Sequence, residues 1–316
     1  MAQVLDPWAQ MPSPDPKSVA LRESRAFSQS RRFWAVDRVI LGYFAIACAV
    51  ILGWWTRLPG ATWLFSLHAA GAALLIYEVK RPNRTTHAFR HWYPLLYVAS
   101  CYKETALLIP VVRGSSADQL LANLDFRLWG VHPTVFLERI QFPALTEFLQ
   151  IAYTLFIPAV LLVAVFLWLK GDYFSFRYYA FLIACGFLVS YIGYVIVPAR
   201  GPRFLLAHLQ HAPLTGLWLF NYLQQGLDRL ESAHYDCFPS GHTELTLLAC
   251  WGSRMLSKRL FRVYLGYTPF LIFATVYLRY HYTVDVFAGA ATALLLIAAA
   301  PPVYRRLSQG AQVARD

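Results

Sequence analysis

Long apolar runs, separated by short polar or basic segments, fill most of the chain. Crossing the hydrocarbon core of a bilayer takes about 20 helical residues, and several runs come close to that length. The pattern therefore predicts an all-α protein built as a polytopic bundle of membrane helices. Seven stretches are free of Asp, Glu, Lys and Arg: Val39–Thr56, Leu58–Tyr77, Phe148–Leu169, Tyr178–Ala199, Leu245–Ser253, Val263–Leu278 and Val286–Tyr304. The fifth is short and is extended back to Ser240, across Glu244.

An eighth stretch, His91–Val112, is apolar except for Lys103 and Glu104. The distribution of basic residues indicates that it crosses too. With eight crossings and a cytoplasmic N-terminus, the inside segments hold 19 Lys and Arg and the outside loops hold eight Arg, as the positive-inside rule requires. We therefore expect about eight spans with both termini cytoplasmic.

The composition supports a membrane location. Hydrophobic residues make up 58% of the 316 positions and charged residues only 14%, which is too apolar for a surface that faces water. The net charge of +11 is expected to act at anionic lipid head groups. The basic residues are scattered over short loops, so nucleic acid is not an expected partner. We expect an integral protein of the plasma (inner) membrane.

The same pattern suggests a division of the chain into four parts. Residues 1–32 are polar and rich in Pro, which is typical of a disordered cytoplasmic tail. Residues 33–90 are expected to hold a transmembrane hairpin and a basic loop, residues 91–305 a membrane domain that contains the polar motifs described below, and residues 306–316 a second cytoplasmic tail. Four of the five cysteines lie inside predicted spans, so no disulfide framework is expected.

Three polar corners fall at span ends that face the same, extracytoplasmic side. Because successive helices alternate in direction, segments that are distant in sequence are expected at one level of the membrane. The corners are Val197–Arg203, Pro239–His242 and Leu278–Asp285.

Two of these corners offer groups that bind anions. The helix that begins at Ser240 presents unpaired backbone amides and the positive end of its dipole. Gly241 permits close approach to the backbone. Arg200 and Arg203 supply forked, permanently charged donors that match phosphate oxygens.

The histidines supply nucleophilic and acid chemistry. His281 and Asp285 are four residues apart, so on a helix they share a face. The carboxylate can hold one imidazole nitrogen protonated while the other faces a substrate. His242, on a different helix, is free to act as an acid.

These residues carry a resemblance to a known family. Pro-Ser-Gly-His at 239–242 and His-Tyr-Thr-Val-Asp at 281–285 resemble the type-2 phosphatidic acid phosphatase and haloperoxidase superfamily. Together with Pro-Ala-Arg-Gly-Pro-Arg at 198–203, they are most similar to its inositol phosphorylceramide synthase and sphingomyelin synthase branch. The resemblance covers Phe148–Tyr304 and a first core span at His91–Val112. It implies a six-helix core with an added N-terminal hairpin.

The resemblance also implies roles for individual residues. His281 would attack phosphorus and become phosphohistidine, Asp285 would orient it, and His242 would protonate the leaving oxygen. The phosphoryl oxygens would be held by Ser240, Gly241, Arg200, Arg203 and Arg279.

The chain departs from the superfamily pattern at two places. A lysine is usual seven residues before the motif arginine, but Gly193 and Ile196 stand there; an arginine is usual six before the histidine, but Thr275 stands there. Lys103 is a candidate replacement for the missing lysine in the phosphate clamp. Alternatively, Lys103 and Glu104 lie near the outer interface and mark a helix end.

The expected activity is phosphoryl chemistry on a phosphorylated lipid, without metal or cofactor. Water as acceptor makes a lipid phosphatase; an alcohol makes a head-group transferase of the inositol phosphorylceramide synthase type. A non-catalytic lipid-binding or transport protein is the alternative, and the membrane spans argue against a vanadate haloperoxidase.

The segment Leu214–Ser232 is expected to form an interfacial helix. The sequence does not indicate an oligomeric state. A zinc site is a competing interpretation, with the ligands His234, Asp236, Cys237 and His242.

Overall fold

A computed structural model describes residues 32–81, 86–230 and 235–308. Over these residues the chain is all-α and contains no strand, only an isolated bridge between Ala199 and Asp236. The expected tails lie almost wholly outside the described residues. The elements are α2 (Ala35–Gly53), α3 (Ala61–Lys80), α4 (Thr86–Arg113), α5 (Asp118–Trp129), α6 (Pro133–Phe136), η1 (Leu137–Ile140), α7 (Pro143–Thr154), α8 (Phe156–Leu169), α9 (Tyr173–Ile196), α10 (Pro202–Leu205), η2 (Ala207–Leu209), α11 (Phe220–Leu230), α12 (Gly241–Ser253), α13 (Lys258–Tyr277) and α14 (Thr283–Ser308).

Six of the described helices, α2, α3, α4, α9, α13 and α14, are long and apolar enough to cross a membrane. The pair α7 and α8, bent by 42°, makes a seventh if it is one span. The remaining expected span, Leu245–Ser253, corresponds to α12, which has only 13 residues. At 1.5 Å per residue it is about 20 Å long, shorter than the roughly 30 Å of a hydrocarbon core. The chain is thus a polytopic bundle with a short inner helix.

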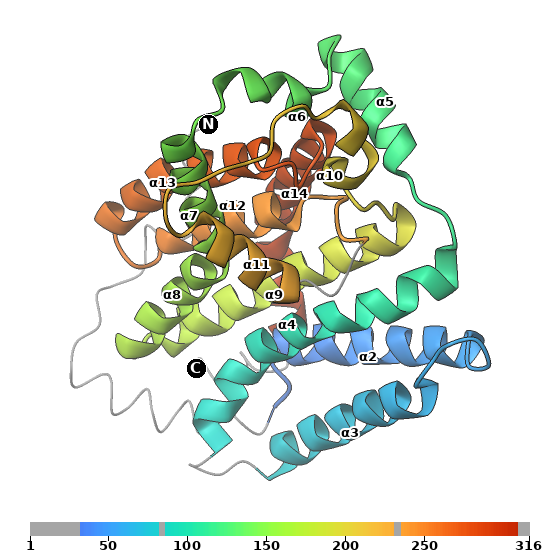
Figure 1. Ribbon diagram of the computed structural model, residues 1–316. Helices are drawn as coiled ribbons and strands as arrows, with labels where there is room; N and C mark the ends of the chain where they lie inside the picture. The colour runs from blue at the N-terminus through green and yellow to red at the C-terminus, as the bar shows by residue number, and fades with distance from the viewer. Residues whose placement is uncertain (1–31, 82–85, 231–234, 309–316) are drawn as a thin grey trace.

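Helices α2 and α3 form the expected N-terminal hairpin, which packs beside α4 (Figure 1). A buried polar contact joins the hairpin to α4. The Glu104 carboxylate lies 2.8 Å from His68 Nε2 and accepts a hydrogen bond from the Tyr43 hydroxyl at 3.2 Å. A charge inside an apolar helix usually has such a partner. The charge that interrupts the eighth stretch is therefore used for helix packing.

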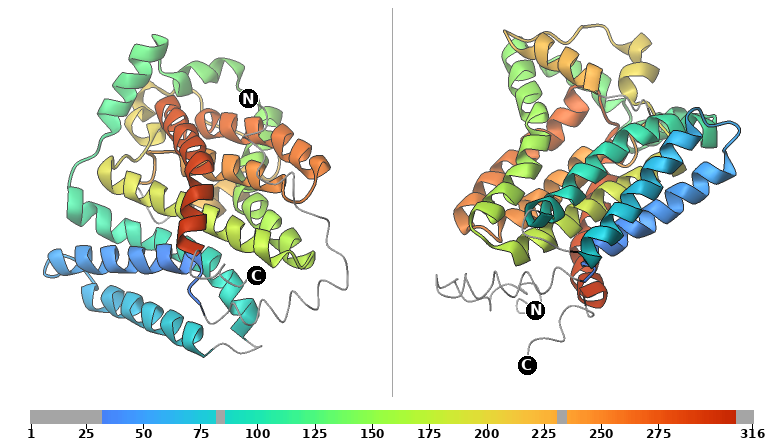
Figure 2. Two further views of the ribbon diagram at one scale, coloured as in Figure 1. Left: turned by 180° about the vertical axis from the view of Figure 1, so that it is seen from behind. Right: turned by 90° about the horizontal axis from the view of Figure 1, so that it is seen from below.

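Helix α9 lies in the core of the bundle, and α14 crosses it, in front of α9 in the view of Figure 2, left. Two tyrosine hydroxyls of α9 donate to carbonyl groups of neighbouring helices: Tyr179 to Val160 at 2.7 Å and Tyr191 to Val98 at 2.6 Å. Buried hydroxyls need such partners where no water is present. These bonds fix α9 against α8 and α4.

Short helices collect at one end of the bundle, at the ends of the long helices (Figure 1). Among them, α5 packs against α10 and the beginning of α14, and α11 packs against α7. Helix α11 lies within the segment expected as an interfacial helix, of which residues 231 and 232 are outside the described part. Trp218 and Tyr222, at the start of this segment, are 79% and 77% exposed.

Candidate active site

The three polar corners lie together at this end of the bundle. Backbone hydrogen bonds join them pairwise: Cys237 N donates to Ala199 O at 3.2 Å, and Ser240 N donates to Asp285 O at 3.0 Å. The third bond, from Arg203 N to Arg279 O, measures 3.1 Å. Loops that precede or follow four different helices thus form one connected framework, as the alternation of helix direction predicted.

The beginning of α12 is tightly enclosed. Ser240 is its N-cap, and the Ser240 hydroxyl accepts a hydrogen bond from Thr243 N at 3.3 Å. A Cβ atom on Gly241 would lie 2.5 Å from the Tyr194 hydroxyl, and one on Gly289 would lie 2.4 Å from Ser240 O. Glycine at both positions therefore lets α9 and α14 approach the helix start closely.

The two histidines are in direct contact. Nε2 of His281 lies 3.3 Å from Nδ1 of His242, and Nδ1 of His281 lies 2.9 Å from the carbonyl oxygen of Cys237. A carbonyl only accepts hydrogen bonds, so Nδ1 of His281 carries the proton and, in the neutral ring, Nε2 carries the lone pair. His242 Nδ1 is then the donor between the rings. This tautomer presents a nucleophilic nitrogen to the other imidazole.

Asp285 lies on the protonated side of His281 but at a longer distance. Its Oδ2 is 3.6 Å from His281 Nδ1, beyond ordinary hydrogen-bond range. The same oxygen accepts from Cys237 Sγ and from Tyr282 N, both at 2.8 Å. The Cys237 carbonyl therefore makes the closer contact to His281, and the fully buried carboxylate adds negative charge behind it.

Aromatic rings surround His242. The Tyr153 ring stacks on it with centroids 4.5 Å apart and an interplanar angle of 26°, and Phe156 lies at 4.5 Å. Tyr280 continues the stack on Tyr153 at 4.5 Å and 9°. Arg203 closes the column with its guanidinium carbon 5.0 Å from the Tyr280 ring centre. His242, the candidate acid, is therefore packed among aromatic rings, and the guanidinium of Arg203 lies at the far end of the stack.

Arg200 and Arg203 lie at the rim of the site. The Arg200 side chain is exposed and lies over Phe204 at 4.3 Å. Arg203 is partly exposed and pairs with Asp228 of α11 at 2.8 Å. Gly201, between them, has φ of +98°, and a Cβ atom there would lie 2.6 Å from Tyr280 O. Only glycine fits this turn without strain.

Arg279 is held by the outer loops. It is 7% exposed and adopts a positive φ of 66°, which is unusual for a residue with a Cβ. Its guanidinium donates to Glu138 at 2.8 Å, to Gln210 at 3.0 Å and to the Ala212 carbonyl at 2.7 Å. Through these contacts, the turn that contains His281 is attached to η1 and to the segment after η2.

A family comparison identifies the group to which this site belongs. Residues 121–299, more than half of the chain, match the family model described as the PAP2 superfamily. The chain belongs to the PAP2 superfamily. No curated protein and no solved structure matched it in the other two comparisons. Superfamily membership supports a phosphatase-like function on lipid head groups, while the match does not extend to the synthase branch that the motifs resemble.

Lys103, the suggested substitute for the PAP2-superfamily lysine, is exposed on α4, beside the inward-facing Glu104. In the part of the chain that the structure describes, no hydrogen bond or ion pair joins Lys103 to the histidines or to the arginine corner. The structure therefore brings together His242, His281, Asp285, Ser240 and Gly241, with Arg200 and Arg203 at the rim, and leaves Lys103 apart from them.

Asp118 of α5 contacts the loops of the candidate site, and sequence reasoning missed it. Its carboxylate accepts from Arg200 N at 2.7 Å, from Gly201 N at 2.8 Å and from the Tyr282 hydroxyl at 2.9 Å. It also contacts the Ser116 hydroxyl. One acid thus fixes the arginine corner to the residue that follows His281.

Asp125, two helical turns later, was also missed. It accepts from Thr283 N at 2.8 Å and from Val284 N at 2.9 Å, the first amides of α14. The spacing of seven puts both acids on one face of α5. That spacing was the only sequence signal, and it does not reveal what the face contacts.

Three potential metal ligands occur together: Cys237 Sγ, His281 Nδ1 and an Asp285 oxygen lie within 4.8 Å of one another. This set differs from the zinc ligands considered from the sequence, of which His234 lies outside the described residues. These atoms already have hydrogen-bond partners, since Cys237 Sγ donates to Asp285 and His281 Nδ1 contacts the Cys237 carbonyl oxygen. Burial raises the pKa of the Cys237 thiol, which favours its protonated, donating form.

Asp236, another of those ligands, lies beside Tyr102 and not in the three-residue set. Its carboxylate accepts a hydrogen bond from the Tyr102 hydroxyl. Burial raises the pKa of Asp236, although the bond from Tyr102 opposes the shift. Asp236 therefore connects the loop before α12 to α4.

Proposed function

We propose that this PAP2-superfamily chain is an integral membrane enzyme that acts on phosphorylated lipids through a phosphohistidine at His281. The observation that carries the proposal is the tautomer of His281. Its Nδ1 proton is held by the Cys237 carbonyl at 2.9 Å, so the Nε2 lone pair faces the reaction space. The negative charge of Asp285 at 3.6 Å would stabilise the cationic ring that forms after attack.

In the proposed reaction, Nε2 of His281 forms a bond to phosphorus while the bond from phosphorus to the leaving oxygen breaks. His242, protonated on both nitrogens when substrate is bound, gives one proton to that oxygen and becomes neutral. In the second step, water or an alcohol attacks the phosphohistidine, His242 takes its proton, and the bond from phosphorus to Nε2 breaks. Each step conserves protons without a further reactant.

A phosphoryl group must enter between the two rings. A reacting phosphorus atom needs to lie about 3 to 3.5 Å from the attacking nitrogen, but His242 Nδ1 already lies 3.3 Å from that nitrogen. We therefore infer that His242 moves away from His281 when substrate binds. Arg200, Arg203 and the amides at the start of α12 would hold the phosphoryl oxygens, because helix starts and guanidinium groups stabilise developing negative charge.

We also propose that the reaction takes place at the extracytoplasmic head-group level of the plasma membrane, with both termini cytoplasmic. The distribution of Lys and Arg over the loops supports this orientation. Accessibility labelling of single cysteines in closed vesicles tests it. A cysteine at exposed Arg229 should react with an impermeant reagent from outside, and a cysteine at Lys258 should not.

Leaving-group dependence tests the proposed roles. His281→Ala should abolish turnover of phosphatidic acid and eliminate an acid-labile phosphoenzyme. His242→Ala should lower kcat about 10²- to 10⁴-fold on the same lipid, with much of the loss recovered on a lipid nitrophenyl phosphate whose leaving group needs no proton. A phosphoenzyme that persists in His281→Ala, or an equal loss on both substrates in His242→Ala, contradicts the assignment.

A head-group transferase of the inositol phosphorylceramide synthase type is a second candidate. The aromatic wall of Tyr153, Phe156 and Tyr280 favours a lipid alcohol over water as the acceptor. Purified protein supplied with phosphatidylinositol and ceramide should then form a new phosphorylated sphingolipid. Free phosphate or inositol phosphate as the sole product would favour hydrolysis. Lipid binding without turnover in every assay would favour a non-catalytic protein.

A further inference from the structure

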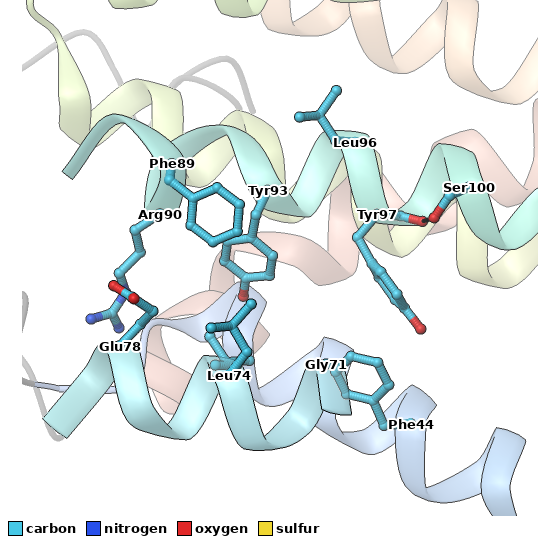
Figure 3. A pocket seen from close by; sticks show the side chains of 11 residues that line it. Phe44, Gly71, Leu74, Glu78, Phe89, Arg90, Tyr93, Leu96, Tyr97 and Ser100 are labelled. Atoms are coloured by element: carbon cyan, nitrogen blue, oxygen red, sulfur yellow. Dashed lines mark hydrogen bonds between the residues drawn. The ribbon is translucent and has the colours of Figure 1, made fainter. Parts of the chain in front are cut away.

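A cavity lies between the N-terminal hairpin and α4, outside the residues that match the PAP2-superfamily model. Its volume is about 270 Å³, near the lower limit for small-molecule sites. Figure 3 shows Gly71, Leu74 and Glu78 of α3 facing Phe89, Tyr93 and Tyr97 of α4 across it. Phe44 of α2 closes one end of the cavity.

The cavity and the catalytic histidines lie on different faces of α4. The lining residues of α4, from Phe89 to Ser100, recur every three or four positions and therefore share one face. Tyr102, which donates to Asp236 in the loop before α12, is two residues after Ser100 and so points about 200° away from that face. A ligand here would not contact the proposed reaction site.

The wall is apolar and opens laterally. Leu74, Phe89 and Leu96 border the cavity and are 49%, 48% and 63% exposed. Because α3 and α4 are both long and apolar enough to cross a membrane, exposed leucines on them face acyl chains. An alkyl chain can therefore enter the cavity from the bilayer.

One end of the cavity carries a buried carboxylate. Glu78 is 8% exposed, and its Oε2 has no hydrogen-bond partner among the described residues. The nearby Arg90 donates to Asp37 at 2.7 Å and to the Arg32 carbonyl at 2.6 Å. Arg90 forms an ion pair with Asp37, and in the described part of the chain no ion pair includes Glu78.

A buried carboxylate oxygen without a partner is costly, and a cationic donor relieves that cost. A primary ammonium group has three N–H donors and one positive charge, which suits both the charge and the acceptor. We propose that this cavity binds a membrane lipid with a primary ammonium group, its chain along Leu74 and Phe89 and its ammonium on Glu78. This site is separate from the proposed catalytic function.

The test uses full-length protein in detergent, with bound lipid measured by native mass spectrometry. The probes are phosphatidylethanolamine, its trimethylated analogue phosphatidylcholine, phosphatidylglycerol and a long-chain base. Phosphatidylethanolamine and the long-chain base both carry ammonium N–H donors, but only phosphatidylethanolamine carries a phosphate. Preferential retention of either one supports the site and identifies the source of the ammonium. Equal retention of all four lipids overturns it.

Two variants locate the binding. Glu78→Gln keeps the shape and removes the charge, and should weaken retention of the ammonium lipid about tenfold, corresponding to about 1.4 kcal/mol. Leu74→Trp fills the cavity and should prevent binding while Glu78 remains. Ile76→Trp, on the same helix but outside the lining, is the matched control and should retain the lipid.

The variants also separate this site from the catalytic one. His281→Ala should bind the ammonium lipid as the parent does, with turnover lost. Unchanged lipid retention in both Glu78→Gln and Leu74→Trp would overturn the proposal. Lipid loss in His281→Ala would place the binding at the catalytic site instead, and would equally overturn it.

Discussion

Replacing Asp118 by Asn tests whether α5 positions the arginine corner, which is proposed to hold the phosphoryl oxygens. The carboxylate accepts backbone hydrogen bonds on both oxygens, from Arg200 at 2.7 Å and from Gly201 at 2.8 Å. An amide retains one acceptor oxygen and turns its NH₂ toward the other backbone N–H. One charge-assisted hydrogen bond of about 1.5 to 3 kcal/mol is lost, and two donors then face each other.

If that energy holds the arginine corner for the transition state, kcat/KM falls about 10- to 100-fold. Orthovanadate, which mimics phosphate, supplies a readout that a general loss of stability does not move. Asp118→Asn should raise its inhibition constant by a similar factor in the fraction that remains folded.

Asp125→Asn is the matched control. It changes the same residue type on the same face of α5, but its contacts are with Thr283 and Val284 at the start of α14. This variant should lower the thermal midpoint without raising the vanadate inhibition constant. If Asp118→Asn keeps the parental inhibition constant and kcat/KM, or if both variants shift them equally, the positioning role is wrong.

Three further substitutions probe the loops around the site. Gly201→Ala should lower both the thermal midpoint and turnover, because φ is +98° and the new Cβ would lie 2.6 Å from Tyr280 O; a variant of parental stability would contradict the close approach. Glu147→Gln should speed proteolysis at α11, since the Glu147 carboxylate accepts four amides at 2.6 to 3.3 Å from residues 217–220; unchanged protection would show that the contact is dispensable. Cys237 should resist iodoacetamide at pH 8 until the protein is denatured, because the thiol is 2% exposed and burial raises its pKa, which lowers the thiolate fraction; rapid labelling of folded protein would refute this, with Cys237→Ala as the control for peptide assignment.

The sequence was sufficient to predict the helical bundle and the meeting of the three corners. Both follow from one rule, since apolar helices that alternate in direction return every second loop to the same side. His242 and His281 are 39 residues apart in sequence and 3.3 Å apart in space for this reason. The superfamily assignment rested on the same two motifs and is confirmed by the match to residues 121–299, whereas the synthase branch is not.

The sequence was insufficient where a polar residue had alternative partners. Arg279 was expected at the phosphate, but Glu138 and Gln210 hold its guanidinium. Asp285 was expected to bond His281, yet the Cys237 carbonyl lies closer. No periodicity encodes a carbonyl as a partner, because every residue carries one.

The contacts of the outer helices explain how loops can hold a site that needs fixed geometry. Loop amides near a membrane surface have no helix or strand to satisfy them, and each unpaired one weakens the fold. Asp118, Asp125 and Glu147 each accept backbone amides from a loop or a helix start. Asp118 and Asp125 lie on α5 and Glu147 lies on α7, so the loops are held by helices other than those that carry the histidines. The arginines and the start of α12 are therefore left to face the space beside the histidines, where a phosphoryl group would bind.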